Sequence, residues 1–148
     1  GRVTPMETRA YVALAGTFGY ELDITRLTEE EKQKAISFNQ LYHRYNDLIR
    51  EGEYYRIASY RENQMYDCWQ VVSQDMAESL VTYVQVRFET DQNSRRLKLE
   101  GLDPKTRYRL EGTQEVYSGE MLMNAGFLQE MIFGDYGSRL LHFVAEKR

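Results

Sequence analysis

The chain has 148 residues, which is enough for one ordinary domain or for a small domain joined to part of another. Hydrophobic residues make up 42% and charged residues 28%, so the composition is that of a globular protein and excludes wholesale disorder. The net charge of −4 and the lack of a Lys/Arg block argue against binding of nucleic acid through its phosphates. No apolar run approaches the roughly 20 residues of a membrane helix, and the N-terminus does not read as a signal peptide.

Residues 4–16 predict a short helix at the start of the chain. The sequence begins at Gly1 without a methionine, so we expect either a processed end or, in preference, a cut inside a longer protein. Thr4 is a good N-cap, Pro5 suits the first helical position, and Glu7 can complete a capping box. The resulting helix of about residues 5–15 is marginal on its own, so we expect it to pack on another part of the molecule.

Residues 17–24 read Thr-Phe-Gly-Tyr-Glu-Leu-Asp-Ile, in which large apolar residues alternate with small or charged ones. A period of two predicts a strand, and Gly19 within it suggests a close backbone approach. We expect this strand to precede a much longer helix.

Residues 28–51 give the clearest element of the sequence, an amphipathic helix. It starts at a second capping box, Thr28 with Glu31, and Gly52 is a plausible C-cap. Steps of three and four place its apolar residues along one stripe, as expected for a helix with one buried face. The stripe consists of Phe38, Leu41, Tyr42, Tyr45, Leu48 and Ile49.

After Gly52 the period changes to two. Short strands are predicted over 54–59, 68–73, 80–88, 96–100, 106–110, 114–117 and 138–145, separated by polar turns. The stretch 120–125 is ambiguous and could form one helical turn. We therefore predict a mainly β protein with N-terminal helices, in which residues 52–148 form an antiparallel β-sandwich or barrel and residues 1–51 are the tail of a larger α/β domain.

The residues that could carry chemistry form no recognisable site in the sequence. Neither histidine has partners at metal-ligand spacing. We therefore expect His43, on the long helix, to lie at the surface. We expect His142, in the last strand, to be a structural histidine with its hydrogen bonds satisfied. The single cysteine, Cys68, excludes an internal disulfide and a cysteine-rich metal site, and we expect it to be a buried thiol. Glu21 and Asp23 lie at the end of the strand that would face a barrel active site, but ion pairing or capping of the next turn is preferred.

Tyrosine is unusually frequent, with 12 residues beside one tryptophan. Aromatic faces can stack on sugar rings, so a free-standing carbohydrate-binding module that uses Trp69 or a tyrosine cluster is the alternative from another functional class. Core and interface packing is the preferred explanation for these aromatic residues.

Several sequence blocks resemble the bacterial α-galactosidases of glycoside hydrolase family 36. The blocks are GRVTPMETR at 1–9, GTFGYELD at 16–23, LIREG at 48–52, LKLEGLDP at 97–104, YSGEMLMNAG at 117–126 and GDYGS at 134–138. The resemblance implies a C-terminal fragment that contains the last helix, strand and helix of a (β/α)8 barrel and then a Greek-key β-sandwich. Residues 1–51 would be the barrel remnant and residues 52–148 the sandwich.

The resemblance also limits the expected function. Family members are retaining enzymes that hydrolyse terminal α-galactosyl residues of oligosaccharides such as raffinose and melibiose, with one aspartate as nucleophile and another as acid/base. Both lie on earlier barrel strands, and no position here matches either motif. We therefore expect no catalytic residue, no metal site and no cofactor in this chain, leave its substrate-binding residues unknown, and expect it to be inactive alone, in the cytoplasm of a bacterium.

The long helix has a further consequence. Its stripe, with Phe38, Leu41, Tyr45 and Leu48, is suited to packing on a barrel that the chain does not contain. The stripe must bury itself on the sandwich, on residues 5–24 or on a second copy, because exposed apolar patches promote association. We predict self-association through residues 1–51, and no nucleic-acid or membrane partner.

Overall fold

The computed structural model describes residues 3–19, 23–91 and 94–147. The helices are α1 (Met6–Ala13), the 3-10 turn η1 (Ile24–Arg26), α2 (Glu29–Glu51), α3 (Tyr60–Asn63) and α4 (Gly119–Asn124). The strands are β1 (Glu53–Ala58), β2 (Tyr66–Val72), β3 (Glu78–Gln85), β4 (Ser94–Leu97), β5 (Arg107–Leu110), β6 (Val116–Ser118), β7 (Phe127–Glu130) and β8 (Gly137–Ala145).

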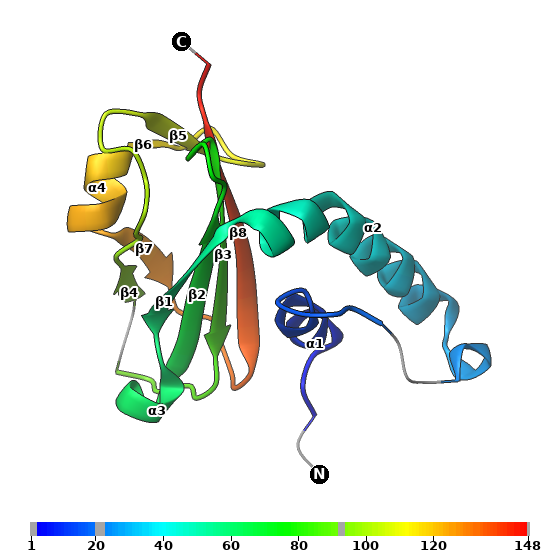
Figure 1. Ribbon diagram of the computed structural model, residues 1–148. Coiled ribbons are helices and arrows are strands. Elements are labelled where there is room, and N and C mark those ends of the chain that lie inside the picture. The colour runs from blue at the N-terminus through cyan, green and yellow to red at the C-terminus, as the bar shows by residue number, and fades with distance from the viewer. Residues whose placement is uncertain (1–2, 20–22, 92–93, 148) are drawn as a thin grey trace.

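The strands form two antiparallel sheets. The larger sheet has six strands in the order β1-β2-β3-β8-β5-β6, and the smaller pairs β4 with β7. The chain crosses from one sheet to the other after β3, β4, β6 and β7, as in Greek-key sandwiches. Figure 1 shows α4, β4 and β7 on one side of the six-stranded sheet and α1 and α2 on the other. The antiparallel sandwich expected from the sequence is confirmed.

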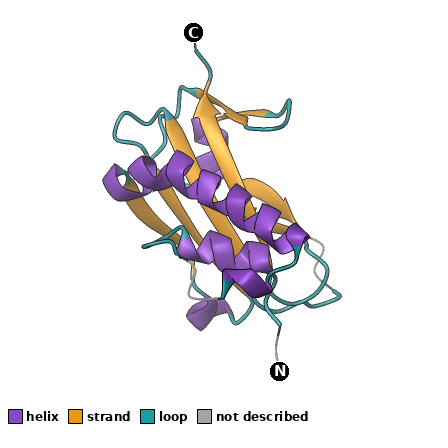
Figure 2. Ribbon diagram, turned by 90° about the vertical axis from the view of Figure 1, so that its right-hand side faces the viewer, coloured by secondary structure: helices purple, strands orange, loops and turns teal. Residues whose placement is uncertain are grey.

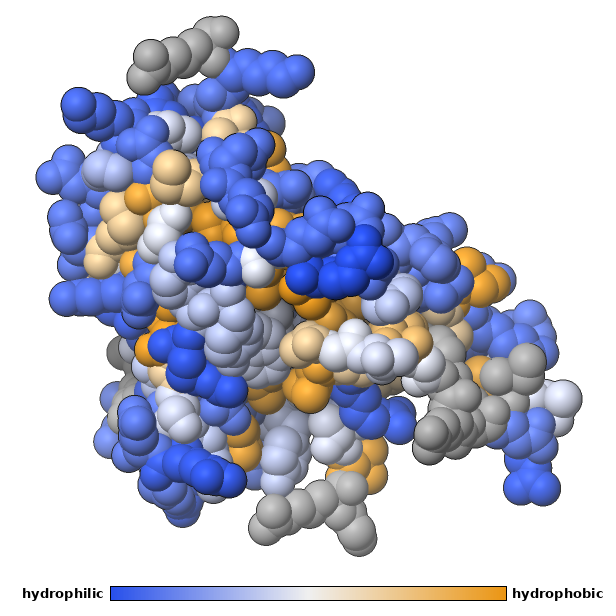
Figure 3. Space-filling model, in the orientation of Figure 1, coloured by the Kyte–Doolittle hydropathy of each residue, from blue (hydrophilic) through white to orange (hydrophobic). Residues whose placement is uncertain are grey.

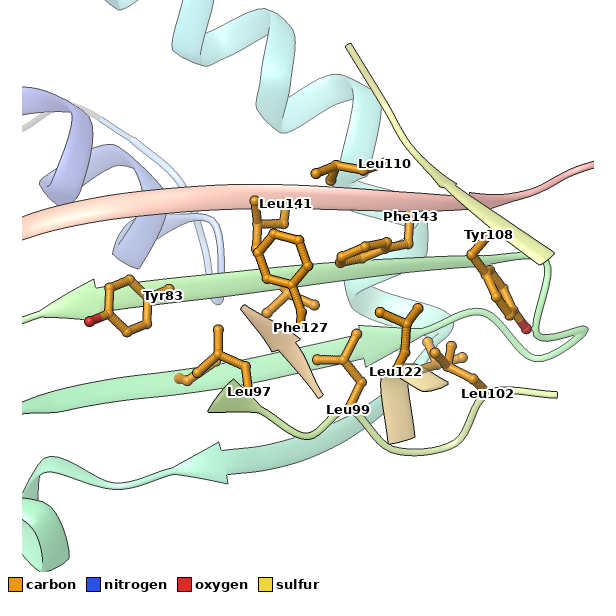
Figure 4. Close-up of a cluster of buried hydrophobic side chains, with 13 residues drawn as sticks. Tyr83, Leu97, Leu99, Leu102, Tyr108, Leu110, Leu122, Phe127, Leu141 and Phe143 are labelled. Carbon is orange, nitrogen blue, oxygen red and sulfur yellow. The ribbon is translucent and has the colours of Figure 1, made fainter. Parts of the chain in front are cut away.

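The main hydrophobic core lies between the two sheets. The large sheet supplies Tyr83, Leu141 and Phe143, and the opposite layer supplies Leu97 and Phe127. Figure 4 shows these side chains pointing toward one another. Phe143 and Phe127 pack edge to face with ring centroids 5.5 Å apart, an arrangement that aromatic quadrupoles favour.

The strand β3 is buried on both faces, which its sequence reflects. Alternate residues such as Leu80 and Thr82 face the helices, while Val81 and Tyr83 face the sandwich core, and all are buried. The strand ends at Gln85, three residues before the expected end, where the amides of Val86 and Arg87 both donate to the Met65 backbone oxygen instead of continuing the ladder. The structure adds β7 and α3, which the sequence analysis did not identify.

Helix α2 begins where predicted. The Thr28 hydroxyl accepts from the Glu31 amide at 3.2 Å, and the Glu31 carboxylate accepts from the Thr28 amide at 2.9 Å, so the capping box is complete. Gly52 is the C-cap, although with extended rather than left-handed dihedral angles. Its lack of a side chain is needed for space, because a Cβ there would lie 2.6 Å from the backbone oxygen of Leu48.

Two N-terminal expectations differ from the structure. The first helix is capped by Pro5 without a side-chain hydrogen bond, so the predicted Thr4 cap is wrong and the helix spans Met6–Ala13. The expected strand over 17–24 does not form in its described part: residues 17–19 are irregular and Ile24 begins η1, while residues 20–22 lie outside the described residues. A strand forms only where its backbone pairs with another strand, and in the two described sheets no strand pairs with residues 17–19.

Candidate functional site at the junction of the helical arm and the sheet

Helices α1 and α2, called here the helical arm, lie across the face of the six-stranded sheet that is turned away from β4 and β7. Figure 2 shows both helices in front of the strands. The C-terminal half of α2 packs on the sheet, where Tyr45 and Leu48 form a second buried cluster with Val71 of β2 and Leu80 of β3. The apolar stripe is therefore buried partly on the sandwich, which is one of the three outcomes expected from the sequence.

The N-terminal half of α2 is covered by α1 and the segment after it. The ring of Phe38 meets Tyr11 of α1 edge to face at 6.3 Å, and Tyr42 stacks on Phe18 at 5.5 Å. Helix α1 is itself fixed to the sheet, because the buried Thr8 hydroxyl donates to the backbone oxygen of Tyr136 at 2.6 Å. The apolar stripe of α2 is thus covered in two places, by the sheet and by α1 with the segment that follows it.

His142 lies at the centre of a polar cluster under α2. Its Nδ1 is 2.6 Å from a carboxylate oxygen of Glu111, and its Nε2 is 2.8 Å from a carboxylate oxygen of Glu78. The Tyr45 hydroxyl of α2 is 3.3 Å from the same Nδ1, and the Tyr45 ring packs edge to face on the imidazole. Each ring nitrogen therefore lies within hydrogen-bond distance of a carboxylate, so this buried side chain has a polar partner on both sides.

Arg44 extends this cluster to the helix surface. Its guanidinium donates to the second carboxylate oxygen of Glu111 and lies 5.2 Å from the centre of the Tyr45 ring. The hydrogen bond from Arg44 is the main cause that holds the pKa of Glu111 below its usual range, and the hydrogen bond with His142 adds to it. The cluster joins α2, β3, β8 and the turn after β5. Its hydrogen bonds therefore hold the helix against the sheet.

The low pKa of Glu111 predicts a pH dependence of stability. A carboxylate that binds protons less readily in the folded than in the unfolded chain stabilises the fold above its unfolded pKa, and this contribution is lost as the pH falls through the lower folded pKa. We expect Glu111→Gln to cost about 1 kcal/mol or less near pH 6, since the Glu111 side chain is 40% exposed, and to cost less near pH 3, where protonation of Glu111 begins to remove the contribution. Urea unfolding of both proteins at the two pH values measures the difference. An equal cost at both would contradict the assignment.

The histidines and the cysteine occupy the structural roles expected from the sequence. His142 is buried with both nitrogens engaged, and His43 is exposed on α2 with its ring against Tyr42. Cys68 is fully buried, and burial raises the pKa of its thiol to about 12, so the nucleophilic thiolate is not available at neutral pH.

The two acidic residues of the expected barrel strand do not form a described pair. Asp23 accepts from the Thr25 amide at 3.0 Å and contacts Arg26 at 3.3 Å, so it caps the turn as the sequence analysis preferred. Glu21 lies outside the described residues. In the described ranges no three His, Cys, Asp or Glu side chains gather in a way that could hold a metal ion. Nor does the described chain contain a helix with the length and apolar character to cross a membrane.

Trp69, the expected centre of a sugar-binding alternative, lies on the same sheet face as the arm. Arg56 sits 6.0 Å from the indole ring and 5.7 Å from the Tyr54 ring. The cavity beside Trp69, which is also lined by Leu14 at the C-cap of α1, has about 50 Å³. That volume holds one or two water molecules, whereas ligand pockets measure about 300–1,000 Å³. Trp69 therefore does not support a sugar site on this face.

The partners of His142 could not be predicted from the sequence. Glu78, Glu111 and Arg44 come from three separate elements, and no spacing in the sequence relates them. The alternation of the last strand does put His142 on one face with Leu140, opposite Leu141 and Phe143. A histidine between Leu140 and Val144 on one strand face is the one signal that could have indicated a buried polar cluster.

Comparison with known proteins agrees with this architecture. The profile of the Glycosyl hydrolase family 36 C-terminal domain matches residues 66–143, and the Melibiase profile matches residues 1–52. The chain belongs to glycosyl hydrolase family 36. The family resemblance of the sequence is thereby confirmed, and the matches cover both the helical arm and the sandwich.

Relatives in this family are whole α-galactosidases. Alpha-galactosidase Mel36A of Lactobacillus acidophilus is 35% identical over 145 residues, which are 98% of this chain and 20% of that protein. AgaA of Geobacillus stearothermophilus is 43% identical over 126 residues, 85% of this chain and 17% of AgaA. A variant of this GH36 α-galactosidase solved in complex with raffinose superposes with a TM-score of 0.93 and 38% identity, over 99% of this chain and 20% of that one. The chain thus spans about a fifth of the length of its relatives.

Proposed function

We propose that this chain is the C-terminal portion of a retaining α-galactosidase that hydrolyses terminal α-galactosyl residues of oligosaccharides such as raffinose. The support is that the chain aligns over 98% of its length with about a fifth of Mel36A. We further propose the division made from the sequence: residues 1–51 as the remnant of the catalytic barrel and residues 52–148 as the C-terminal sandwich domain. The end of α2 at Glu51 and the start of β1 at Glu53 favour this boundary.

Within such an enzyme, the role we propose for the chain is structural. The single observation that carries it is the His142 cluster, in which α2, the proposed last barrel helix, is bound to β3 and β8 of the sandwich. Its acidic residues are used in holding the helix, not aimed into an open cleft. The sandwich therefore supports the final barrel helix and holds it in position.

The activity of the chain can be compared directly with that of the whole protein. We expect the full-length enzyme to release 4-nitrophenol from 4-nitrophenyl α-D-galactopyranoside, and the 148-residue chain to show no turnover above background. The physical reason is that the barrel, and with it the active site, needs eight strands. Turnover by the purified chain, or a full-length protein inactive on α-galactosides, would contradict the proposal.

We also propose that isolated copies of the chain self-associate through residues 1–51. The support is that Val12 of α1 and Ile36 of α2 are exposed apolar side chains. Figure 3 shows apolar, orange surface among the blue on the helical side of the molecule. We expect a dimer in analytical ultracentrifugation that Ile36→Glu weakens, while Met121→Glu, at an exposed site on α4, leaves it unchanged. A monomer at high concentration would contradict this.

The cytoplasmic location expected from the sequence also stays a proposal. Fractionation of the producing bacterium tests it, and recovery of the protein in the culture medium would contradict it.

A further inference from the structure

A second feature lies at the end of the six-stranded sheet where β3 ends and β8 begins. Phe133, in the loop of residues 131–136 that joins β7 to β8, is 93% exposed, more than any other large hydrophobic side chain in the described parts of the chain. Its ring lies against that of Phe88, in the segment after β3, with centroids 5.7 Å apart and ring planes tilted by 39°. The two rings, called here the aromatic tip, place apolar surface in contact with water, which is unfavourable.

The loop that carries Phe133 is fixed by one buried side chain. Gln85, the last residue of β3, is 0% exposed, and its Nε2 donates to the backbone oxygens of Ile132 and Gly134. Its Oε1 accepts from the Ile132 amide at 3.3 Å, so both backbone neighbours of Phe133 are bound. Phe133 therefore projects from an ordered backbone, and a partner that covers it does not have to order the loop first.

The backbone of the same loop is also strained. Tyr136 has a φ of 61°, in the left-handed region that bulky side chains disfavour. The Asp135 carboxylate accepts from the Phe88 amide at 2.8 Å, which ties the two segments of the aromatic tip together. Strained backbone persists where the surrounding structure enforces it, and it is common where a protein binds a partner. A fixed loop that presents an exposed phenylalanine is typical of a preformed contact surface, because aromatic side chains are enriched at interfaces.

The position of the loop indicates which partner covers it. The Thr8 hydroxyl, in the first turn of α1, donates to the Tyr136 backbone oxygen at 2.6 Å and lies 2.7 Å from the Ser138 hydroxyl. Figure 1 shows residues 3–5 leaving α1 toward the end of the sheet where β8 begins. The C-terminal domain profile matches residues 66–143, and the chain aligns with 20% of Mel36A, so most of an enzyme of this kind precedes Gly1. Its chain would reach α1 beside the aromatic tip.

The size of the aromatic tip separates the possible occupants. A phenylalanine side chain buries about 150–250 Å², so two of them offer about 500 Å² or less. A stable interface between separate proteins needs about 800 Å² on each partner. The tip is therefore too small to hold a second copy of the chain by itself. A covalently connected partner needs less area, because the linkage keeps its effective concentration high.

We propose that the aromatic tip is a contact surface for the part of the parent enzyme directly upstream of Gly1, which covers Phe133 and fixes the sandwich to the barrel at this end of the sheet. The inference rests on the proposed function, in which such an upstream barrel exists. It adds a second junction to that of the His142 cluster. The cluster binds α2 to the sheet, and the tip binds the chain that precedes α1.

Thiol labelling of Phe133→Cys tests the proposal, because Cys68 is fully buried in the same domain and does not compete. The variant is made in the 148-residue chain and in the full-length protein, and mass spectrometry follows the modification of the peptide that carries it by N-ethylmaleimide. We expect labelling to be at least about tenfold slower in the full-length protein, equivalent to about 1.4 kcal/mol, at every protein concentration. Met121→Cys, at an exposed site on α4, is the matched control and should be labelled at the same rate in both proteins.

Hydrogen exchange of the unsubstituted proteins is a second measurement that keeps the phenylalanine ring in place. Amides of residues 86–88 and 131–136 should exchange more slowly in the full-length protein than in the chain, while those of 119–124 should not change. Equal exchange of the first two segments in both proteins would overturn the proposal. Protection that appears in the chain alone and grows with its concentration would also overturn it, because a second copy would then be the occupant. The proposed function is tested separately by the activity assay: an active full-length enzyme with an unprotected tip refutes the contact alone.

Discussion

Replacing Phe143 with alanine should lower the free energy of unfolding by about 3–5 kcal/mol, the range for large-to-small changes in a packed core. Phe143 is 0% exposed, sits on a central strand and contacts both Phe127 and Tyr117 through ring edges. The alanine variant loses the buried ring and leaves a cavity between the two sheets. Urea unfolding followed by fluorescence measures the change, which is a large part of the about 5–15 kcal/mol that stabilises a typical domain.

The matched control is the next residue. Val144 points to the other face of β8 and is 37% exposed, so Val144→Ala should change stability by about 0.5 kcal/mol or less. Similar losses for the two variants would show that the space between the sheets is not the principal core.

Replacing Tyr45 with alanine should release the end of α2 from the sheet. Tyr45 is 5% exposed, its ring contacts His142 at 5.0 Å between centroids, and its hydroxyl reaches the same imidazole. We expect a loss of about 3 kcal/mol in the free energy of unfolding. Hydrogen exchange should show faster opening of α2 amides than of β3 amides, because the variant weakens the junction and leaves the sandwich core intact.

Two further variants separate the ring from its hydroxyl and from the helix. Tyr45→Phe keeps the ring and should cost about 1 kcal/mol, the net value of one hydrogen bond. His43→Ala is two positions earlier on the same helix but exposed, so it should have almost no effect. If Tyr45→Ala accelerated exchange equally in α2 and β3, the arm and the sheet would unfold as one unit and the junction would not be a separate point of weakness.

The elements with strong local signals were predictable from the sequence. The capping box at Thr28, the stripe through Tyr45 and Leu48, and the alternation in 138–145 are all set by neighbours along the chain. The structure shows each of them within one or two residues. The strand β7 escaped detection because only four residues, Phe127–Glu130, alternate there, and one of the two inward residues is the polar Gln129.

The features that were missed depend on pairing between distant segments. The His142 cluster requires Glu78, 64 residues away, and Glu111, 31 residues away, and the partner strands of β8 are β3 and β5. Nothing local specifies such pairing. The segment 17–24 shows the converse case: its sequence alternates, but a strand forms only where other strands pair with its backbone, and no described strand pairs with residues 17–19.

The joint at Gly52 has a mechanical consequence. A single residue separates the end of α2 from the start of β1, and that residue is wedged against the backbone oxygens of Leu48 and Val72. Because no flexible linker separates α2 from β1, a rotation of either element must change the position of the other. A force that tilts the N-terminal end of the 23-residue helix α2 would therefore also displace β1, the edge strand of the six-stranded sheet.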